Sequence, residues 1–201
     1  MSHGTAWQSH EAAVARLKAS YDEIPAGAPV RLAKKTSNLF RPRAATASKG
    51  LDVSGLDGVI EVDVEARTAD VQGMCTYEHL VDATLPHGLI PYVVPQLKTI
   101  TLGGAVTGLG IESTSFRSGL PHESVLEMDV FTGAGEVVTT RPAPDEHSEL
   151  FDTFPNSYGS LGYATRIRIK LEPVPDRVEL RHVRFDDAGL LSKTIAEIVE
   201  T

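Results

Sequence analysis

The sequence holds a single cysteine, Cys75, among its 201 residues. One thiol excludes an internal disulfide framework and any zinc site built from Cys-x-x-Cys pairs. The absence of disulfides is typical of a reducing cytosol, so we expect a cytoplasmic protein, with peripheral association with a membrane left open. We expect the side chain of Cys75 itself to be a small buried hydrophobe.

Long apolar runs are also missing. The uncharged stretch 99–111 carries three threonines and four glycines, whereas a membrane-spanning helix needs roughly 20 mostly apolar residues. The first five residues show no basic segment that leads into an apolar one, so no signal peptide is visible. The sequence therefore predicts neither a transmembrane segment nor a secretory leader.

Positive charge is scarce, with 19 basic against 27 acidic side chains and a net charge of −8. This balance argues against a nucleic-acid partner, because binding to phosphates needs clustered Lys and Arg. One stretch, 31–43, departs from this balance because it holds five basic residues. Two interpretations stay open for it: a local anion site, or a solvated strand edge.

The usual signatures of metal and nucleophilic chemistry are absent. None of the seven histidines forms a His-x-x-x-His pair, so we predict no metal site. The segment Gly159-Ser160-Leu161-Gly162 lacks the spacing of the G-x-S-x-G nucleophile elbow. The catalytic residues therefore stay unassigned.

The hydrophobic content of 41% predicts an ordinary folded protein. Hydrophobic periodicity and turn residues predict helices over 5–21 and 76–85 and a shorter helix within 145–154. They predict strands over 30–33, 59–63, 68–72, 125–132, 136–141 and 163–171. In the last of these, charged residues alternate with Ile167 and Ile169, which is typical of a half-exposed strand.

The prolines at 173 and 175 predict a domain boundary. A further strand over 178–185 and a helix over 188–199 are expected after it, and these two elements cannot bury a core alone. Residues 176–201 are therefore expected to be the beginning of a second domain.

Four glycines, Gly103, Gly104, Gly108 and Gly110, are concentrated in residues 101–110. Glycines let a backbone approach a bulky ligand and turn its N–H groups towards an anion, so Thr101 to Gly104 could cradle a pyrophosphate. A tightly packed, turn-rich strand in a β core explains the same composition. Glu112 follows this run, and two interpretations stay open for it: a carboxylate close to a ligand, or an exposed carboxylate in a turn.

The run TLGGAVTGLGIESTS at 101–115 resembles the FAD-binding segment of the PCMH-type flavoproteins, the vanillyl-alcohol-oxidase superfamily. Within that group it is most similar to the sterol side-chain (Δ24) reductase-like branch. The neighbouring order agrees, with Pro95 before the run, Arg117-Ser118-Gly119 after it, and Gly133-Ala134-Gly135 and Gly159-Ser160-Leu161-Gly162 further on. The resemblance covers roughly residues 29–173.

The resemblance implies an α+β, two-lobed PCMH-type FAD-binding domain over 1–175, with lobes at about 28–95 and 96–175, followed by the start of a separate substrate (cap) domain. It places three segments on FAD. The first pyrophosphate loop matches Lys34, Lys35, Thr36, Ser37, Asn38, Leu39 and Phe40. The central loop matches Gln96, Thr101, Leu102, Gly103, Gly104, Ala105, Val106, Thr107, Gly108, Leu109, Gly110, Ile111, Glu112, Ser113 and Thr114. The end of the domain matches Gly162 and Ala164.

Many relatives bind the flavin covalently through a histidine of the first loop, and this chain has no histidine at 34–40. We therefore expect non-covalent FAD, with the N–H groups of Gly103 and Gly104 and the Thr101 hydroxyl facing the pyrophosphate. The basic stretch 31–43 then has an anion to bind.

The leading hypothesis is an FAD-dependent oxidoreductase that reduces a double bond in a sterol or isoprenoid side chain, with a small, apolar substrate. One alternative is an FAD-linked oxidase or dehydrogenase of an alcohol, hydroxy acid or sugar. Another is a non-catalytic flavin-binding or interaction module. NADPH, oxygen and a quinone all stay open as the electron partner.

Overall fold

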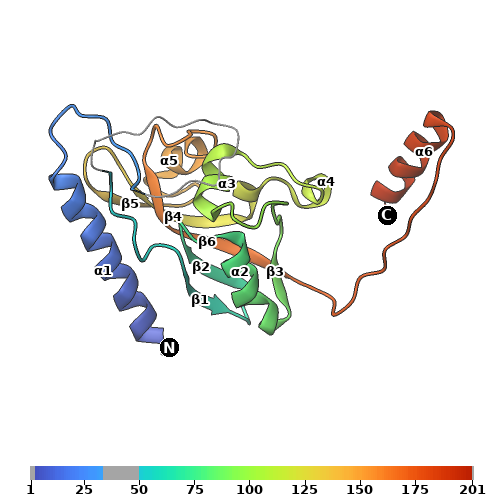
Figure 1. The fold of residues 1–201 in the computed structure, drawn as a ribbon, viewed down its shortest axis with the longest axis horizontal. Coiled ribbons are helices and arrows are strands. Elements are labelled where there is room, and N and C mark those ends of the chain that lie inside the picture. The colour runs from blue at the N-terminus through green and yellow to red at the C-terminus, as the bar shows by residue number, and fades with distance from the viewer. Residues whose placement is uncertain (1–2, 34–49, 201) are drawn as a thin grey trace.

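The computed structural model describes residues 3–33 and 50–200. Within them, six antiparallel strands form one sheet that helices cover (Figure 1). The fold is α+β, as predicted. The first pyrophosphate loop, residues 34–40, lies outside the described part of the chain.

The sheet is centred on one long strand. β6 (Tyr163–Pro173) pairs on one side with β2 (Thr68–Gln72) and on the other with β4 (Val125–Phe131), and its C-terminal end also pairs with β3 (Leu89–Pro91). The edges are β1 (Val59–Asp63) and β5 (Val137–Thr140), each joined to its neighbour by a hairpin. Strands from both predicted lobes thus join in a single sheet.

Local sequence features explain where several of the helices begin and end. α1 (His3–Asp22) confirms the predicted N-terminal helix, and α2 (Tyr77–Thr84) begins where the Thr76 side chain accepts a hydrogen bond from the N–H of His79. A short 3₁₀ turn, η1 (Leu85–His87), continues α2 and ends at Gly88, whose φ of 68° suits a glycine. The remaining helical segments are α3 (Leu102–Gly108), α4 (Ser115–Ser118), η2 (Pro121–Ser124), α5 (Ser148–Thr153) and α6 (Ala188–Val199).

Two buried clusters hold these layers together. The larger lies between the sheet and α2 and α3 and includes Leu80, Val106 and Ile167. The smaller lies under α1 and joins Leu17 to Leu51 and Phe131. Cys75 belongs to the larger cluster, as predicted, and burial raises the pKa of its thiol to about 12.

Two of the predicted strands are wrong, and so is one of the two interpretations of the glycine run. Residues 30–33 form no strand; one parallel bridge joins Leu32 to Leu51, with the N–H of Ala33 donating to the Leu51 carbonyl. Residues 178–185 form no strand either, because no neighbouring strand within the described residues pairs with them. The glycine run is not a turn-rich strand but α3.

The predicted half-exposure of β6 is confirmed from Ile167 onward, where Ile167 and Ile169 are buried, Arg168 is partly exposed and Lys170 is exposed, but it is wrong at Arg166. β6 is the central strand, and the side chain of Arg166 is only 8% exposed. Its guanidinium binds the carboxylates of Asp70, Glu127 and Asp129. Burial lowers the pKa of Arg166, but the hydrogen bonds to these carboxylates outweigh it, so the pKa lies above its ordinary value. α1 covers this network, with the ring of Trp7 5.8 Å from the guanidinium carbon.

Candidate functional site

A groove made of two adjoining hollows is the candidate site. The first, here the glycine hollow, has a volume of about 100 Å³ and is lined by Leu32, Met74, Gly103, Gly104, Thr107, Tyr158, Gly159, Tyr163 and Ala164. The second, here the aromatic hollow, has about 150 Å³ and is lined by Tyr21, Val30, Leu51, Phe131, Thr132, Gly133, Gly159, Ser160, Gly162 and Tyr163. The two hollows share Gly159 and Tyr163 in their linings, so they adjoin each other, and together they are called the groove here.

The floor of the glycine hollow exists because backbones touch there without side chains between them. A Cβ on Gly73 would lie 1.9 Å from the carbonyl oxygen of Ala164, and one on Gly103 would lie 2.6 Å from that of Gly73. The N–H of Gly103 donates to the Gly73 carbonyl at 2.9 Å. This packing holds the start of α3 against β2 and β6.

The predicted role of the Gly103 N–H is therefore wrong, because the Gly73 carbonyl already occupies it. The Thr101 side chain caps α3 by accepting a hydrogen bond from the N–H of Gly104 at 3.3 Å. Gly104 itself is exposed and lines the groove. Gly104, rather than Gly103, is thus the residue whose missing side chain leaves space for a ligand.

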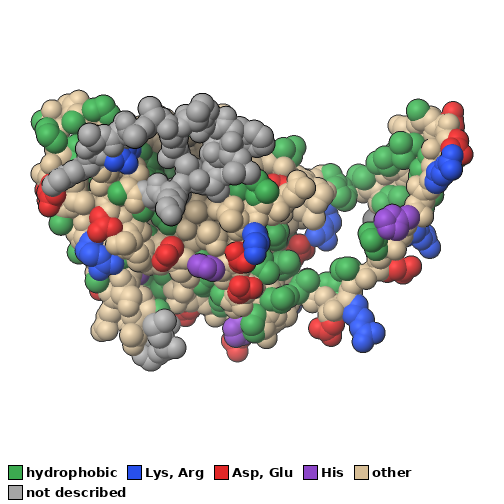
Figure 2. Space-filling model, viewed as in Figure 1, with side chains coloured by type: hydrophobic (Ala, Val, Ile, Leu, Met, Phe, Trp, Pro, Cys, Tyr) green, Lys and Arg blue, Asp and Glu red, His purple; other side chains and the backbone are tan. Residues whose placement is uncertain are grey.

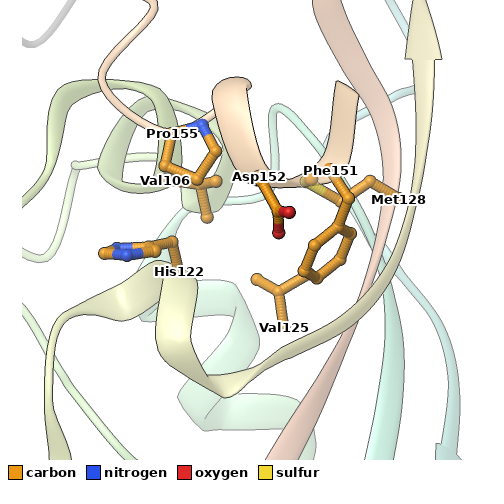
Figure 3. A pocket seen from close by; sticks show the side chains of 7 residues that line it. All are labelled: Val106, His122, Val125, Met128, Phe151, Asp152 and Pro155. Carbon is orange, nitrogen blue, oxygen red and sulfur yellow. The ribbon is translucent and has the colours of Figure 1, made fainter. Parts of the chain in front are cut away.

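Because the central loop is helical, its residues point in different directions. Gly104 and Thr107 line the groove, whereas Leu102 and Ala105 are buried in the core. Val106 points to a separate hollow of about 170 Å³, here the His122 cavity, which Figure 3 shows between α5 and η2. That cavity is lined by Val106, His122, Val125, Met128, Phe151, Asp152 and Pro155, and the Nδ1 atom of His122 is buried there without a hydrogen-bond partner in the described part of the chain.

The end of the predicted segment lies beyond α3. Leu109 adopts a left-handed conformation with φ 48°, and the N–H of Gly110 donates to the Ala105 carbonyl. The chain then exposes Ile111 and Ser113. The Thr114 hydroxyl donates to the carbonyl of Tyr92, which fastens this stretch to the segment before it.

Gln96 and Glu112, two residues that the resemblance assigned to FAD, are brought together. The backbone N–H of Gln96 donates to the Glu112 carboxylate at 3.2 Å, and the N–H of Glu112 donates to the Ser115 hydroxyl. Glu112 is partly buried, so it is not the exposed turn carboxylate of the alternative interpretation.

The turn before β6 joins the two hollows. Gly162, with φ 136°, borders the aromatic hollow, where a Cβ would lie 2.3 Å from the Phe131 carbonyl oxygen. The N–H of Tyr158 donates to the Thr107 carbonyl, and its hydroxyl donates to that of Gly108 at 3.4 Å. Burial raises the pKa of Tyr163, which keeps its hydroxyl protonated.

Several lining residues carried no sequence signal. In the sequence, Tyr21 is one of several apolar residues of a predicted helix, and Phe131 is one of several apolar residues of a predicted strand. Met74 and Tyr158 stand outside any motif. The one available signal was Gly159, in the glycine-rich segment that ends at Gly162.

Among residues 3–33 and 50–200, no cluster of three or more metal-ligating side chains occurs. In the same residues, no helix is long and apolar enough to cross a membrane.

Comparison with known proteins defines the class. Residues 7–141 match the FAD binding domain family, which is more than half of the chain. The chain therefore belongs to this family of PCMH-type FAD-binding domains, in the vanillyl-alcohol-oxidase superfamily. The family is one of FAD-binding oxidoreductases, and the predicted cofactor, FAD, is confirmed.

The similar proteins fall into two groups. Cytokinin dehydrogenase 10 of Oryza sativa subsp. japonica is 36% identical over 128 residues, which are 64% of this chain and 23% of that protein. Cytokinin dehydrogenase 5 of Arabidopsis thaliana is 38% identical over 116 residues, 58% of this chain and 21% of that protein. Delta(24)-sterol reductase of Pisum sativum is 29% identical over 132 residues, 66% of this chain and 23% of that protein. The chain thus spans less than a quarter of the length of these relatives.

The groove fits FAD in part. The aromatic hollow is mostly apolar and aromatic, which suits a ring system. In the glycine hollow the N–H groups of Gly103 and Gly104 and the Thr107 hydroxyl already donate within the chain, so these three groups offer a diphosphate space rather than hydrogen bonds. Gly104 leaves space where a side chain would project into the groove.

Proposed function

We propose that this chain is the FAD-binding part of an oxidoreductase that holds FAD non-covalently. The observation that carries the proposal is the pair of adjoining hollows between α1, α3 and the turn 157–162, since α1 and α3 belong to the matched domain. Non-covalent binding is supported by the first loop, because residues 34–40 contain no histidine that could bond to the flavin. Bound FAD supplies the hydride transfer, while the chain binds and orients it.

The mode of attachment is tested by denaturing the purified yellow protein in acid and filtering it. Non-covalent FAD passes into the filtrate and leaves a colourless protein. Flavin absorbance that stays with the precipitated chain contradicts the proposal. The protein is also titrated with FAD and then freed of unbound cofactor. If it retains no flavin absorbance, the result favours a non-catalytic interaction module.

For the reaction, we propose reduction of a carbon–carbon double bond in a sterol or isoprenoid side chain. The resemblance of residues 101–115 to the reductase branch and the 29% identity to a delta(24)-sterol reductase support it. An apolar substrate also agrees with the surface past α3, where Ile111 is 77% exposed and Phe116, five residues later in α4, is 64% exposed. No charged anchor is needed for such a substrate.

The second candidate is the opposite direction, FAD-linked dehydrogenation of the substrate. The identities of 36% and 38% to two cytokinin dehydrogenases favour it. Under this candidate the substrate is an alcohol, hydroxy acid, sugar or a cytokinin-type compound.

The two candidate reactions differ in the oxidation state of the flavin that reacts with the substrate. The assay uses a protein that includes the whole of the proposed substrate domain. We expect an unsaturated sterol or prenyl compound to reoxidise its reduced form, followed by the return of the flavin absorbance, and a hydroxy acid or sugar to leave its oxidised form unchanged. Bleaching of the oxidised protein by a cytokinin, hydroxy acid or sugar contradicts the reductase proposal. Gly104→Val, which fills the groove, is the matched control and removes the signal in both assays.

We also propose that residues 176–201 begin a separate substrate domain after the FAD-binding part, 1–175. Nothing of α6 is buried against the rest of the described chain, and Val178 and Leu180 are 86% and 78% exposed. Figure 2 shows hydrophobic side chains along this segment, away from the packed part of the molecule. Exposed apolar groups in such number indicate an absent packing partner.

A substrate domain closes over the flavin ring and excludes water. We therefore expect the 201-residue chain to bind FAD weakly and to show little turnover. Efficient turnover by this chain contradicts the division into two domains.

A further inference from the structure

The His122 cavity is separated from the groove by α3. Gly104 and Thr107 of this helix line the glycine hollow, whereas Val106, between them in sequence, lines the His122 cavity. Among residues 3–33 and 50–200, none lines both this cavity and either hollow of the groove. The cavity is therefore a second concave site, which the proposed function of the groove does not use.

Most of the wall of the His122 cavity is apolar. Val125 and Met128 of β4 are buried there, and Phe151 of α5 and Pro155, which follows α5, are partly buried. The volume is about 170 Å³, and a cavity of roughly 150 Å³ holds a benzene-sized ligand. The cavity therefore has space for one six-membered ring with a short substituent.

Asp152 is the one acidic residue that lines this cavity within the described chain. Figure 3 shows its carboxylate directed into the hollow, between His122 on one side and Phe151 on the other. Within residues 3–33 and 50–200, Asp152 has no hydrogen-bond or ion-pair partner. It is also exposed, so a ligand can reach it from solvent. The cavity thus offers an unpaired negative charge beside an apolar and partly aromatic surface.

This combination is the chemistry that recognises an organic cation. A cationic group pairs with the Asp152 carboxylate, and a positive charge close to the ring of Phe151 is also attracted by its π-system. The apolar body of the same ligand is removed from water in the hollow. A neutral ligand of equal size lacks the ion pair, and an anionic one is repelled by Asp152.

We infer that the His122 cavity binds a small aromatic amine in its protonated form, with the ring in the apolar hollow and the ammonium group at Asp152. The site is separate from the groove, so the inference does not rest on the proposed binding of FAD.

The test titrates the isotope-labelled protein with benzylamine, which is protonated at neutral pH, and follows the backbone amides by NMR. Benzyl alcohol and benzoate have the same size without the positive charge, and butylamine carries the charge on a stem like that of a lysine side chain. We expect benzylamine to bind about fivefold more tightly than benzyl alcohol or butylamine. The amides of His122 and of 151–155 shift, and benzoate does not bind.

Two variants separate the charge from the ring. Asp152→Asn keeps the shape of the cavity, so we expect it to weaken benzylamine about fivefold and to leave benzyl alcohol within twofold. Phe151→Leu keeps an apolar wall without the ring and weakens benzylamine more than butylamine. Asp82→Asn is the matched control, because it removes an exposed carboxylate of α2 that does not line the cavity. It leaves all four affinities unchanged.

Equal affinities for benzylamine and benzyl alcohol overturn the inference, because they show that Asp152 recognises no charge. Equal affinities for benzylamine and butylamine overturn the preference for an aromatic ring. Equal losses in Asp152→Asn and Asp82→Asn also contradict it, since they reflect only the net charge of the protein. Saturation with FAD leaves the benzylamine affinity within twofold, whereas competition between the two ligands contradicts a separate site.

Discussion

The two ends of the groove are built on different principles. At the glycine end, backbones of β2, α3 and β6 touch, and the shape depends on what Gly73 and Gly103 lack. At the aromatic end, side chains make the walls, and Tyr21 and Phe131 come from elements that are distant in sequence. The glycine end therefore tolerates no added atom at Gly73 or Gly103, whereas the aromatic end depends on how firmly α1 is held.

The largest effect is expected from the network that holds α1 to the sheet. Arg166→Ala leaves Asp70, Glu127 and Asp129 buried without their common partner, which costs roughly 3–5 kcal/mol of unfolding free energy. Urea denaturation measures it. Arg184→Ala, which removes an exposed ion pair with Asp186, serves as control and changes stability by less than about 1 kcal/mol.

A loss of stability as small as that of Arg184→Ala contradicts the structural role of the network.

At the glycine end, Gly73→Ala is expected to destabilise the fold by about 3 kcal/mol or more. The new Cβ meets the Ala164 carbonyl oxygen at 1.9 Å, and a backbone cannot yield as a side chain can. Thermal unfolding measures it. Gly108→Ala is the matched control, because a Cβ there would have no neighbouring atom within 4 Å. We expect its melting temperature to stay close to that of the unaltered protein. Similar melting temperatures for the two variants show that the backbones do not touch as described.

Gly104→Val separates cofactor binding from stability. Gly104 is exposed and lines the groove, so we expect the variant to lose FAD. Its Cβ would lie 2.9 Å from the Thr101 hydroxyl oxygen that caps α3, so we expect it to stay folded with a loss of stability of about 1–2 kcal/mol. Absorbance of the purified protein checks the flavin content. Gly108→Val, on the same helix, retains FAD; full flavin occupancy in Gly104→Val argues against this assignment of the groove.

The smallest expected effect is on the pH dependence of the stability of the fold. His10 on α1 is 5% exposed and lies beside Gln72, with Asp129, Arg166, Glu11 and Asp70 as the charged groups around it. Burial lowers the pKa of His10 below its ordinary 6.5, and the repulsion from Arg166 acts in the same direction. Below pH 6.5 the unfolded chain therefore takes up a proton before the folded one, so stability is full above this pH and declines as the pH falls.

We expect His10→Gln to flatten this decline between pH 6.5 and 5, as measured by urea denaturation at several pH values. The exposed His147→Gln leaves it unchanged. Below pH 3.8 a second loss follows, because the hydrogen bonds from Arg166 and Thr139 outweigh burial and lower the pKa of Asp129. An unchanged slope in His10→Gln shows that α1 is not coupled to pH through this residue.

The sequence predicted the helices and strands that are determined by residues close together in the chain. The hairpin of β1 and β2 and the capped helix α2 follow from alternation, turn residues and Thr76, and they lie where expected. α3 was not predicted, because glycines are poor helix formers and the contact of Gly103 with Gly73 is tertiary. The burial of Arg166 was missed for a similar reason, since alternation does not reveal that α1 covers the second face of the sheet.

The site was predicted only where a motif marks it. Gly104, Thr107, Gly162 and Ala164, which the resemblance assigned to FAD, line the two hollows, and their contact with FAD stays a prediction. Tyr21 could not be found, because its contact with Gly133 joins residues 112 positions apart.

Hydrogen exchange of the protein with and without FAD tests the central claim, that FAD lies along this groove. The account predicts slower exchange at the amides of 157–163, at Gly104 and around Tyr21 when FAD is added. It predicts no change around His122 and Phe151, which line the separate cavity. Protection at His122 and Phe151, with none at 157–163, contradicts the account.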